Sequence, residues 1–292
     1  MCSWPTSTRL PERGTGEGTM PTGELRLRME RAEGRSIVAS QRHAGALRVL
    51  RPHYADGSGR PSLTVVNPGG GYLGGDDYRL EAALGSGAGL TLTTQSATKV
   101  YRTPQGPARM EQRFELEAEA RFEFVPDSLI AFRGASYRQR TTVEMHPSAS
   151  LVLAEVVTHG WSPDGAPFSF DEIAMSTRVT AAGAPIAIDR LRLRPARDGT
   201  GALVLGGFSH LATLLVIDPR ADGEAVDSMR DILDVRSTSP DLMVGITRLA
   251  APGFMLRALT RSTPAANTIL HTAIDWMREA WHSLPPLALR KH

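Results

Sequence analysis

The amino-acid sequence predicts an all-β protein: a β-helix-like, layered β-stack with about two helices toward the C-terminus. Apolar residues recur with a period of two from residue 24 onward, as half-buried strands require. A small residue ahead of an apolar one returns about every 30 residues, as in proteins built from stacked units. Helical periodicity appears only after residue 222. Together these three observations favour a β-stack that ends in helices.

Strands follow one another through most of the chain. Leu25, Leu27 and Met29 alternate with charged residues, so this segment is expected to bury one face of a strand. The same alternation returns in residues 114–117, 122–124, 143–145 and 151–153. Turn residues separate these segments, which indicates a succession of short strands.

A weak internal repeat organises these strands. An alanine comes two residues before a large apolar residue at Ala88, Ala120 and Ala149. In a stack of β-coils, a small residue at each turn lets successive layers approach, and each strand pairs with the equivalent strand one layer away. The alternative is that alanine after a turn is common in any all-β protein, and the repeat spacing is irregular.

Two helices are predicted late in the chain. The first covers Gly223 to Val235, where Val226, Met229 and Leu233 recur at helical spacing. The second is expected to have Thr263 as its N-cap and Pro264 at its first position, where proline is favoured. The residues expected on its buried face are Ile269, Ala273, Met277 and Ala280.

The length and composition suit a protein with a full hydrophobic core, since the chain has 292 residues and 41% hydrophobic content. We expect a disordered tail over residues 1–23, a single β domain over residues 24–282 and a C-terminal tail over residues 283–292. The first segment is rich in Gly, Pro, Thr and Glu, and either Met1 or Met20 fits as the first residue.

Charge and cysteine content argue against several classes of protein. The formal net charge is +2 and no block of Lys or Arg is present, so nucleic acid is not expected as a partner. The single cysteine, Cys2, cannot build a disulfide framework or a cysteine-based metal site. No apolar run suits a secretion signal or a membrane span, which favours a cytoplasmic protein.

The motifs of common enzymes are missing. Alternating strand sequence, not a helix, follows the glycine-rich segments 69–75 and 85–89, which argues against a nucleotide site. The eight histidines contain no pair at metal-binding spacing, and no Gly-x-Ser-x-Gly motif occurs. Asp76 and Asp77 would point to opposite faces of a strand. Asp76 is expected either to face a polar channel or to cap the glycine turn.

The most unusual segment is the polar run from Thr93 to Tyr101, which interrupts the alternating apolar pattern. If it is buried, each of its polar groups needs a partner. If it is exposed, it forms a recognition surface, a channel wall or simply a solvated strand. The run contains Lys99, one of only two lysines in the chain.

Three motifs carry a resemblance to a known family. They are Asn67-Pro68-Gly69-Gly70, Gly74-Gly75-Asp76 and the polar run Thr93 to Tyr101. In order and separation they resemble the signature of the UreD family, also called UreH, of urease accessory proteins. The step Val125-Pro126 to Ile130-x-Phe132 is similar to the same family. The residues expected to be structural in these motifs are Asn67, Pro68, Gly70, Gly74, Gly75 and Pro126.

The resemblance implies a mostly β, helical-stack fold with two helices and a non-catalytic role in urease maturation. Family members bind the accessory protein UreF, which recruits the GTPase UreG, and the assembly docks on apo-urease. Ni²⁺ would pass through the protein transiently, with no permanent metal site and no bound cofactor. Because Ni²⁺ prefers N and O ligands, we expect Asp76, Thr94, Gln95 and Tyr101 either at the wall of this path or in its structural support. Lys99 is expected to pair with an acid there.

The chain also departs from the family pattern. Gly160-Trp161 and Gly165-Ala166 replace the family's Gly-Arg and Gly-Glu steps, so two charged side chains are lost. Asp164 is expected to substitute for the missing acid, and the family's Arg-Leu-Trp ending is absent. The main hypothesis is a divergent urease accessory scaffold and metallochaperone. The alternative is a β-helical lyase or hydrolase that acts on an acidic polymer, which requires clustered carboxylates beside a cation.

Overall fold

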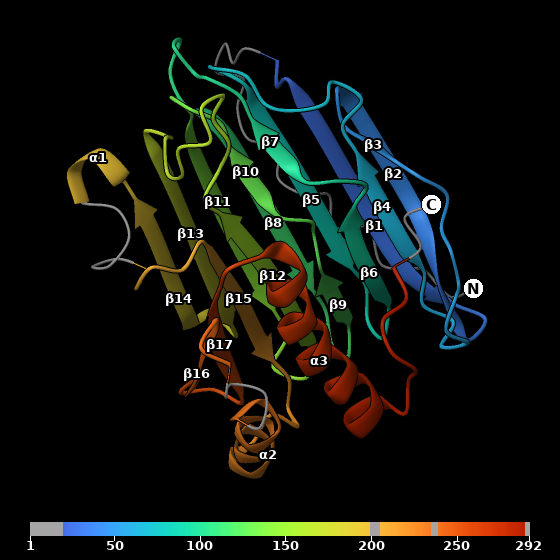
Figure 1. Ribbon diagram of the computed structural model, residues 1–292. Coiled ribbons are helices and arrows are strands. Elements are labelled where there is room, and N and C mark those ends of the chain that lie inside the picture. The colour runs from blue at the N-terminus through green and yellow to red at the C-terminus, as the bar shows by residue number, and fades with distance from the viewer. Residues whose placement is uncertain (1–19, 199–204, 235–238, 290–292) are drawn as a thin grey trace.

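Two large sheets dominate the protein (Figure 1), as seen in a computed structural model that describes residues 20–198, 205–234 and 239–289. The seven-stranded sheet, here sheet A, has the order β14 (Ala184–Leu193), β13 (Glu172–Ala181), β11 (Ser136–Met145), β8 (Ala108–Leu116), β5 (Asp77–Leu84), β1 (Gly23–Ala32) and β2 (Arg35–Gly45). The ten-stranded sheet, here sheet B, has the order β16 (Leu242–Arg248), β17 (Gly253–Thr260), β15 (His210–Ile217), β12 (Ser150–Thr158), β9 (Arg121–Phe124), β6 (Gly89–Thr94), β4 (Ser62–Val66) and β3 (Arg48–Val49). The short strands β7 (Thr98–Val100) and β10 (Leu129–Ala131) pair beside this path.

The chain winds between the two sheets in successive coils. It passes from β5 in sheet A to β6 in sheet B, then to β8 and β9, and then to β11 and β12. Strands of successive coils pair in parallel, with Tyr78 opposite Met110 and Tyr137 opposite Ala108. The predicted β-helix-like stack is therefore confirmed.

The three repeated alanines lie where one coil stacks on the next. Ala88, Ala120 and Ala149 are fully buried. The N–H of Arg121 donates to the carbonyl of Ala88 at 2.9 Å, and the N–H of Ser150 donates to that of Ala120 at 2.8 Å. A small side chain at each turn lets the backbones approach this closely, so the repeat predicted from the sequence corresponds to the stacking of coils.

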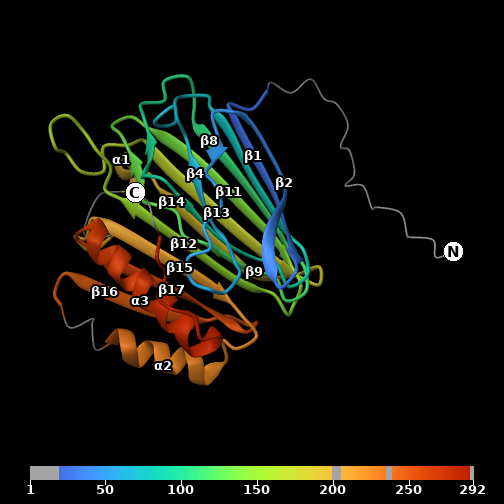
Figure 2. The ribbon, with the colours of Figure 1, turned by 90° about the vertical axis from the view of Figure 1, so that its right-hand side faces the viewer.

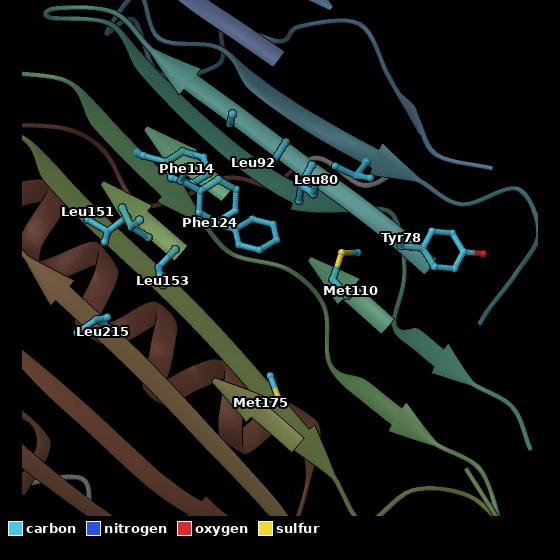
Figure 3. Close-up of a cluster of buried hydrophobic side chains, with 14 of the residues drawn as sticks. Tyr78, Leu80, Leu92, Met110, Phe114, Phe124, Leu151, Leu153, Met175 and Leu215 are labelled. Carbon is cyan, nitrogen blue, oxygen red and sulfur yellow. The ribbon is translucent and has the colours of Figure 1, made fainter. Parts of the chain in front are cut away.

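Two cores separate three layers. The first core fills the space between the sheets, where Phe114, Phe124, Leu80 and Leu151 meet (Figure 3). The second lies between the outer face of sheet B and the helices α2 (Gly223–Asp234) and α3 (Thr263–His282). Figure 2 shows these helices on one side of the molecule and β1 and β2 of sheet A on the other. The outer face of sheet A carries no helix among the described residues.

The late helices match the prediction with three differences. The N-cap of α3 is Ser262, whose Oγ accepts from the N–H of Ala265 at 3.3 Å. Thr263 is instead the first helical residue, and its Oγ1 lies 3.1 Å from Nε2 of His210. Ala280 is exposed, because the last turn of α3 buries Arg278 in its place. A one-turn helix, α1 (Pro195–Asp198), was not predicted, and the expected last residue of α2, Val235, lies outside the described residues.

The ends of the chain are only partly described. Residues 1–19 and 290–292, within the two predicted tails, lie outside the described residues. β1 begins at Gly23, and near the other end the N–H of Leu287 donates to Oδ1 of Asp275 on α3 at 2.7 Å. In the described part of the chain, none of the helices has both the length and the apolar content of a membrane span.

Candidate functional site

A cavity of about 100 Å³, here called the inner cavity, lies between the two sheets. At one end it is lined by the glycine turn at Gly70 and Gly71 and by the polar run from Thr94 to Lys99. The run follows β6, and its parallel neighbour Pro126 follows β9. The stacking of equivalent coils thus brings two of the sequence motifs to the same end of the cavity.

Six of the residues predicted from the sequence line this cavity. They are Asn67, Gly70, Thr94, Gln95, Lys99 and Pro126. Oγ1 of Thr94 accepts from the N–H of Asp127 at 2.8 Å, which fixes the turn after β9 against the polar run. The close approach at Gly71 requires glycine, since a Cβ there would lie 2.5 Å from the ring of Tyr101.

Asp76 caps the glycine turn and does not line the inner cavity. Its Oδ2 accepts from the N–H of Leu73 at 2.7 Å, and its Oδ1 accepts from Oγ1 of Thr22 at 3.2 Å. Tyr78 also donates to it, at 3.5 Å. Of the two roles considered for Asp76, this geometry matches the turn-capping one.

Tyr101 and Asp164 lie outside the cavity, on the loops that connect the coils. Tyr101 contacts Phe132 with 4.9 Å between ring centroids, and Phe132 contacts the half-exposed Trp161 at 4.8 Å. Asp164 is exposed and pairs with Arg133. Hydrogen bonds from Arg133, from the N–H of Ala166 and from Ser162 hold the pKa of the Asp164 carboxyl well below its usual range.

The sequence analysis missed Glu155, which faces the space between the sheets from the middle of β12. Oε1 of Glu155 accepts from Nε2 of Gln139 at 2.5 Å, and Oε1 of Gln139 accepts from the hydroxyl of Tyr137 at 2.9 Å. Burial, with a smaller contribution from Asp189, raises the pKa of Glu155 to about 7. The signal was present, because Glu155 is the one charged residue in the otherwise mostly apolar strand β12 (Ser150–Thr158).

A second cavity of about 440 Å³ adjoins the first. The two cavities share Glu155 and Met175 in their walls. The second one extends to the edge strands β14 and β16, and Asp189 of β14 forms an ion pair there with Arg257 of β17, the strand next to β16. We call the two cavities together the inter-sheet passage, which runs from the polar run to the β14–β16 edge with Glu155 between its two parts.

The walls of the passage carry several polar side chains whose oxygen atoms could bind a cation. Thr94, Gln95, Gln139 and Glu155 supply hydroxyl, amide and carboxylate groups along its walls. Among the described residues no group of three or more His, Cys, Asp or Glu side chains is placed to hold a metal ion. Single oxygen ligands bind a divalent cation far more weakly than a complete set of ligands does.

The fold and the site define a β-coil protein with an interior passage, largely apolar, that carries a few polar side chains and the carboxylate of Glu155. The family described as UreD urease accessory protein matches residues 21–292 of the chain. A protein named urease accessory protein UreD from Actinomyces naeslundii is 44% identical over 272 residues, covering 93% of this chain and 99% of that protein. A protein of the same name from Arthrobacter sp. (strain FB24) is 43% identical over 295 residues, covering 98% and 99%. The chain therefore belongs to the UreD family of urease accessory proteins.

Proposed function

We propose that this protein is a cytoplasmic, non-catalytic maturation factor that conducts Ni²⁺ to apo-urease and bridges a UreF–UreG assembly to it. Family membership supports a role that is accessory to urease. The observation that carries the nickel part of the proposal is the inter-sheet passage with Glu155 at its centre. The ion is cargo in this proposal, and no cofactor stays bound.

The chemistry of the passage suits transient nickel contacts. Ni²⁺ accepts oxygen and nitrogen ligands, and the passage places Thr94 and Gln95 at one end and Glu155 in the middle. Each step then exchanges one or two weak protein ligands, which allows the ion to leave again. Lys99 and Asp127 lie at the same end, where their charges can tune entry of the cation.

The alternative hypothesis of a β-helical lyase or hydrolase is less well supported. Such an enzyme needs a carboxylate and a cationic partner at a solvent-accessible groove. Glu155 instead faces the interior between two sheets, and the relatives that cover nearly the whole chain carry the name of an accessory protein. We therefore propose the accessory role alone.

The test is co-expression of this chain with UreF, UreG and apo-urease of the same organism. We expect the four to co-purify and the urease to gain bound nickel and activity only when this chain is present. Activation of urease to the same level without the chain would overturn the proposal.

Two variants test the passage itself. Glu155→Gln removes the central carboxylate. Gly245→Phe places a large side chain in the second cavity, because Gly245 lies on the face of β16 that lines the passage and a Cβ there would meet no other atom. Both are expected to retain the partners but to lower the nickel content of urease. The matched controls are Glu144→Gln on the outer face of sheet A and Gly245→Ala. Nickel loading equal to that of the controls would contradict the proposed route.

A further inference from the structure

The outer face of sheet A carries a hollow of about 480 Å³ above β13. Five arginines line it, against the two carboxylates of Asp77 and Glu111; the arginines are Arg109, Arg138, Arg140, Arg190 and Arg192. All five are exposed. They come from β8, β11 and β14. The pairing of these strands in sheet A brings the arginines together, although no basic segment of the sequence contains them all.

Residues in register across β11, β13 and β14 form two rows in the hollow, here called rungs. In the first rung, both arginines are paired with an acid. Arg138 of β11 and Arg192 of β14 flank Ala174 of β13 in register. Glu172 of β13 accepts from both, at 3.2 Å from Nη2 of Arg138 and 2.6 Å from Nη2 of Arg192. A single carboxylate thus bridges the two walls of the hollow over a small residue.

The second rung repeats this arrangement without a bridging acid on β13, while Glu111 of β8 is in register with Arg140 on its other side. Arg140 of β11 and Arg190 of β14 flank Ser176 of β13 in register, two residues along from the first rung. Neither guanidinium forms an ion pair or hydrogen bond with any described residue. The two backbones lie two strand spacings apart, about 10 Å, and arginine side chains can converge across that distance on one carboxylate.

We propose that the second rung is a docking site for an acidic segment of a partner protein, with one of its carboxylates held between Arg140 and Arg190 above Ser176. Arg109, which also forms no ion pair with a described residue, provides a further contact on the β8 side of the hollow. The bound carboxylate would reproduce the contacts that Glu172 makes on the first rung. The proposal is independent of nickel transfer.

The size and the charge pattern favour a polypeptide as the occupant. A hollow of about 480 Å³ is much larger than a single carboxylate group and accommodates several residues of an extended chain. A nucleic acid fits less well, because its evenly spaced phosphates would be repelled by the carboxylates around the hollow. These are Asp77 and Glu111 on one side and Glu172 at the first rung. The positive region is confined to a short stretch, as suits a short acidic segment.

The test measures fluorescence anisotropy of a fluorescein-labelled peptide, Gly-Ser-Asp-Glu-Asp-Glu-Ser-Gly, with the full-length protein at low ionic strength. We expect Arg140→Ala with Arg190→Ala to weaken binding at least about tenfold. Ser176→Glu should weaken it similarly while keeping both arginines, because the new carboxylate stands on the strand between Arg140 and Arg190 and competes with the peptide for them.

The matched control is Arg42→Ala with Arg113→Ala, which removes the same charge from exposed positions on the same face outside the hollow. This control should change the affinity less than about twofold. Circular dichroism verifies that every variant is folded. The proposal fails if the wild type does not bind the peptide, if the control weakens binding equally, or if a peptide with Asn and Gln, free citrate or a thymidine oligonucleotide binds as tightly.

Discussion

Arg278 near the end of α3 donates to Glu123 of β9, with 2.7 Å between Nη1 and Oε2, although 155 residues separate them in the chain. Both side chains are almost completely buried. Glu123 also accepts from Arg121 at 2.8 Å and from Thr91 at 2.8 Å, and Arg278 pairs with Asp56 at 2.5 Å. This network attaches the C-terminal helix to the outer face of sheet B.

Replacing Arg278 tests that attachment. Arg278→Met leaves the buried carboxylate of Glu123 and the partly exposed carboxylate of Asp56 without one of their cations, and breaking the buried pair with Glu123 costs about 3–5 kcal/mol. The free energy of unfolding, measured in urea, should fall by this amount. The control is Arg28→Ala, which breaks an exposed pair with Glu30 and should cost less than about 1 kcal/mol. Equal losses in both variants would mean that the buried network does not stabilise the fold.

The same network predicts the response to acid. Burial by itself raises the pKa of Glu123, but Arg121 and Arg278 outweigh it, so its pKa lies below the unfolded value of 4.5. The stability that Glu123 contributes is therefore present above pH 4.5 and is lost as the pH falls through its folded pKa. In Arg278→Met this pKa rises, and acid unfolding followed by circular dichroism should begin about one pH unit higher. An unchanged acid midpoint would contradict this assignment.

Glu155 has the opposite pH dependence. Its pKa is raised from 4.5 to about 7 by burial, so the folded state binds its proton more tightly than the unfolded state. Its contribution to stability is present below pH 4.5 and is lost as the pH rises to about 7. Glu155→Gln should therefore be more stable than wild type at pH 8, by roughly 2–3 kcal/mol, and equally stable at pH 4. Urea unfolding at both pH values measures this, with Glu144→Gln as the control that should show no difference.

The raised pKa of Glu155 also predicts how nickel transfer depends on pH. A carboxylate binds a metal ion only when it is deprotonated, so transfer through the passage should weaken as the pH falls below about 7. The measurement is the rate at which apo-urease gains nickel from the purified assembly, followed from pH 6 to pH 8. Glu155→Gln should be slow at every pH. A variant with the same pH profile as wild type would show that Glu155 does not contact the ion.

The stacking turns predict a cost for larger side chains. Ala120 is fully buried between two coils, so Ala120→Leu overpacks the turn and should destabilise the protein by about 1–3 kcal/mol. Ala280→Leu, which adds the same atoms at an exposed position of α3, should have little effect. Thermal unfolding of both variants measures the difference. Similar unfolding temperatures for the two variants would mean that the turn at Ala120 can hold a larger side chain, against the prediction.

Local patterns predicted most of the fold. Alternation along Leu25 to Met29 follows from the geometry of a strand, and the spacing of Val226, Met229 and Leu233 follows from that of a helix. The errors occurred where a tertiary contact decided the outcome. The hydroxyl of Thr263 lies against His210, and Ser262 serves as the N-cap.

The candidate site was predictable only in part. The polar run and the glycine turn are visible as motifs, and the structure brings Thr94, Gln95 and Lys99 to one cavity. Their role in a nickel path stays a prediction. Asp76 has local partners in its own turn, and no pattern in the sequence distinguishes that capping role from a channel role.

The sequence by itself determined the succession of strands, the repeated alanines, the late helices and the family motifs, because covalent geometry and side-chain periodicity act within a few residues. Only the tertiary structure decided that Glu155 lies beside Gln139 in the passage and that Arg140 and Arg190 flank Ser176. The reason is physical: Glu155 of β12 and Gln139 of β11 meet because the two sheets pack face to face, and Arg140 and Arg190 flank Ser176 because β11 and β14 both pair with β13. Neither the packing of the sheets nor the pairing of their strands can be read from the linear order of residues.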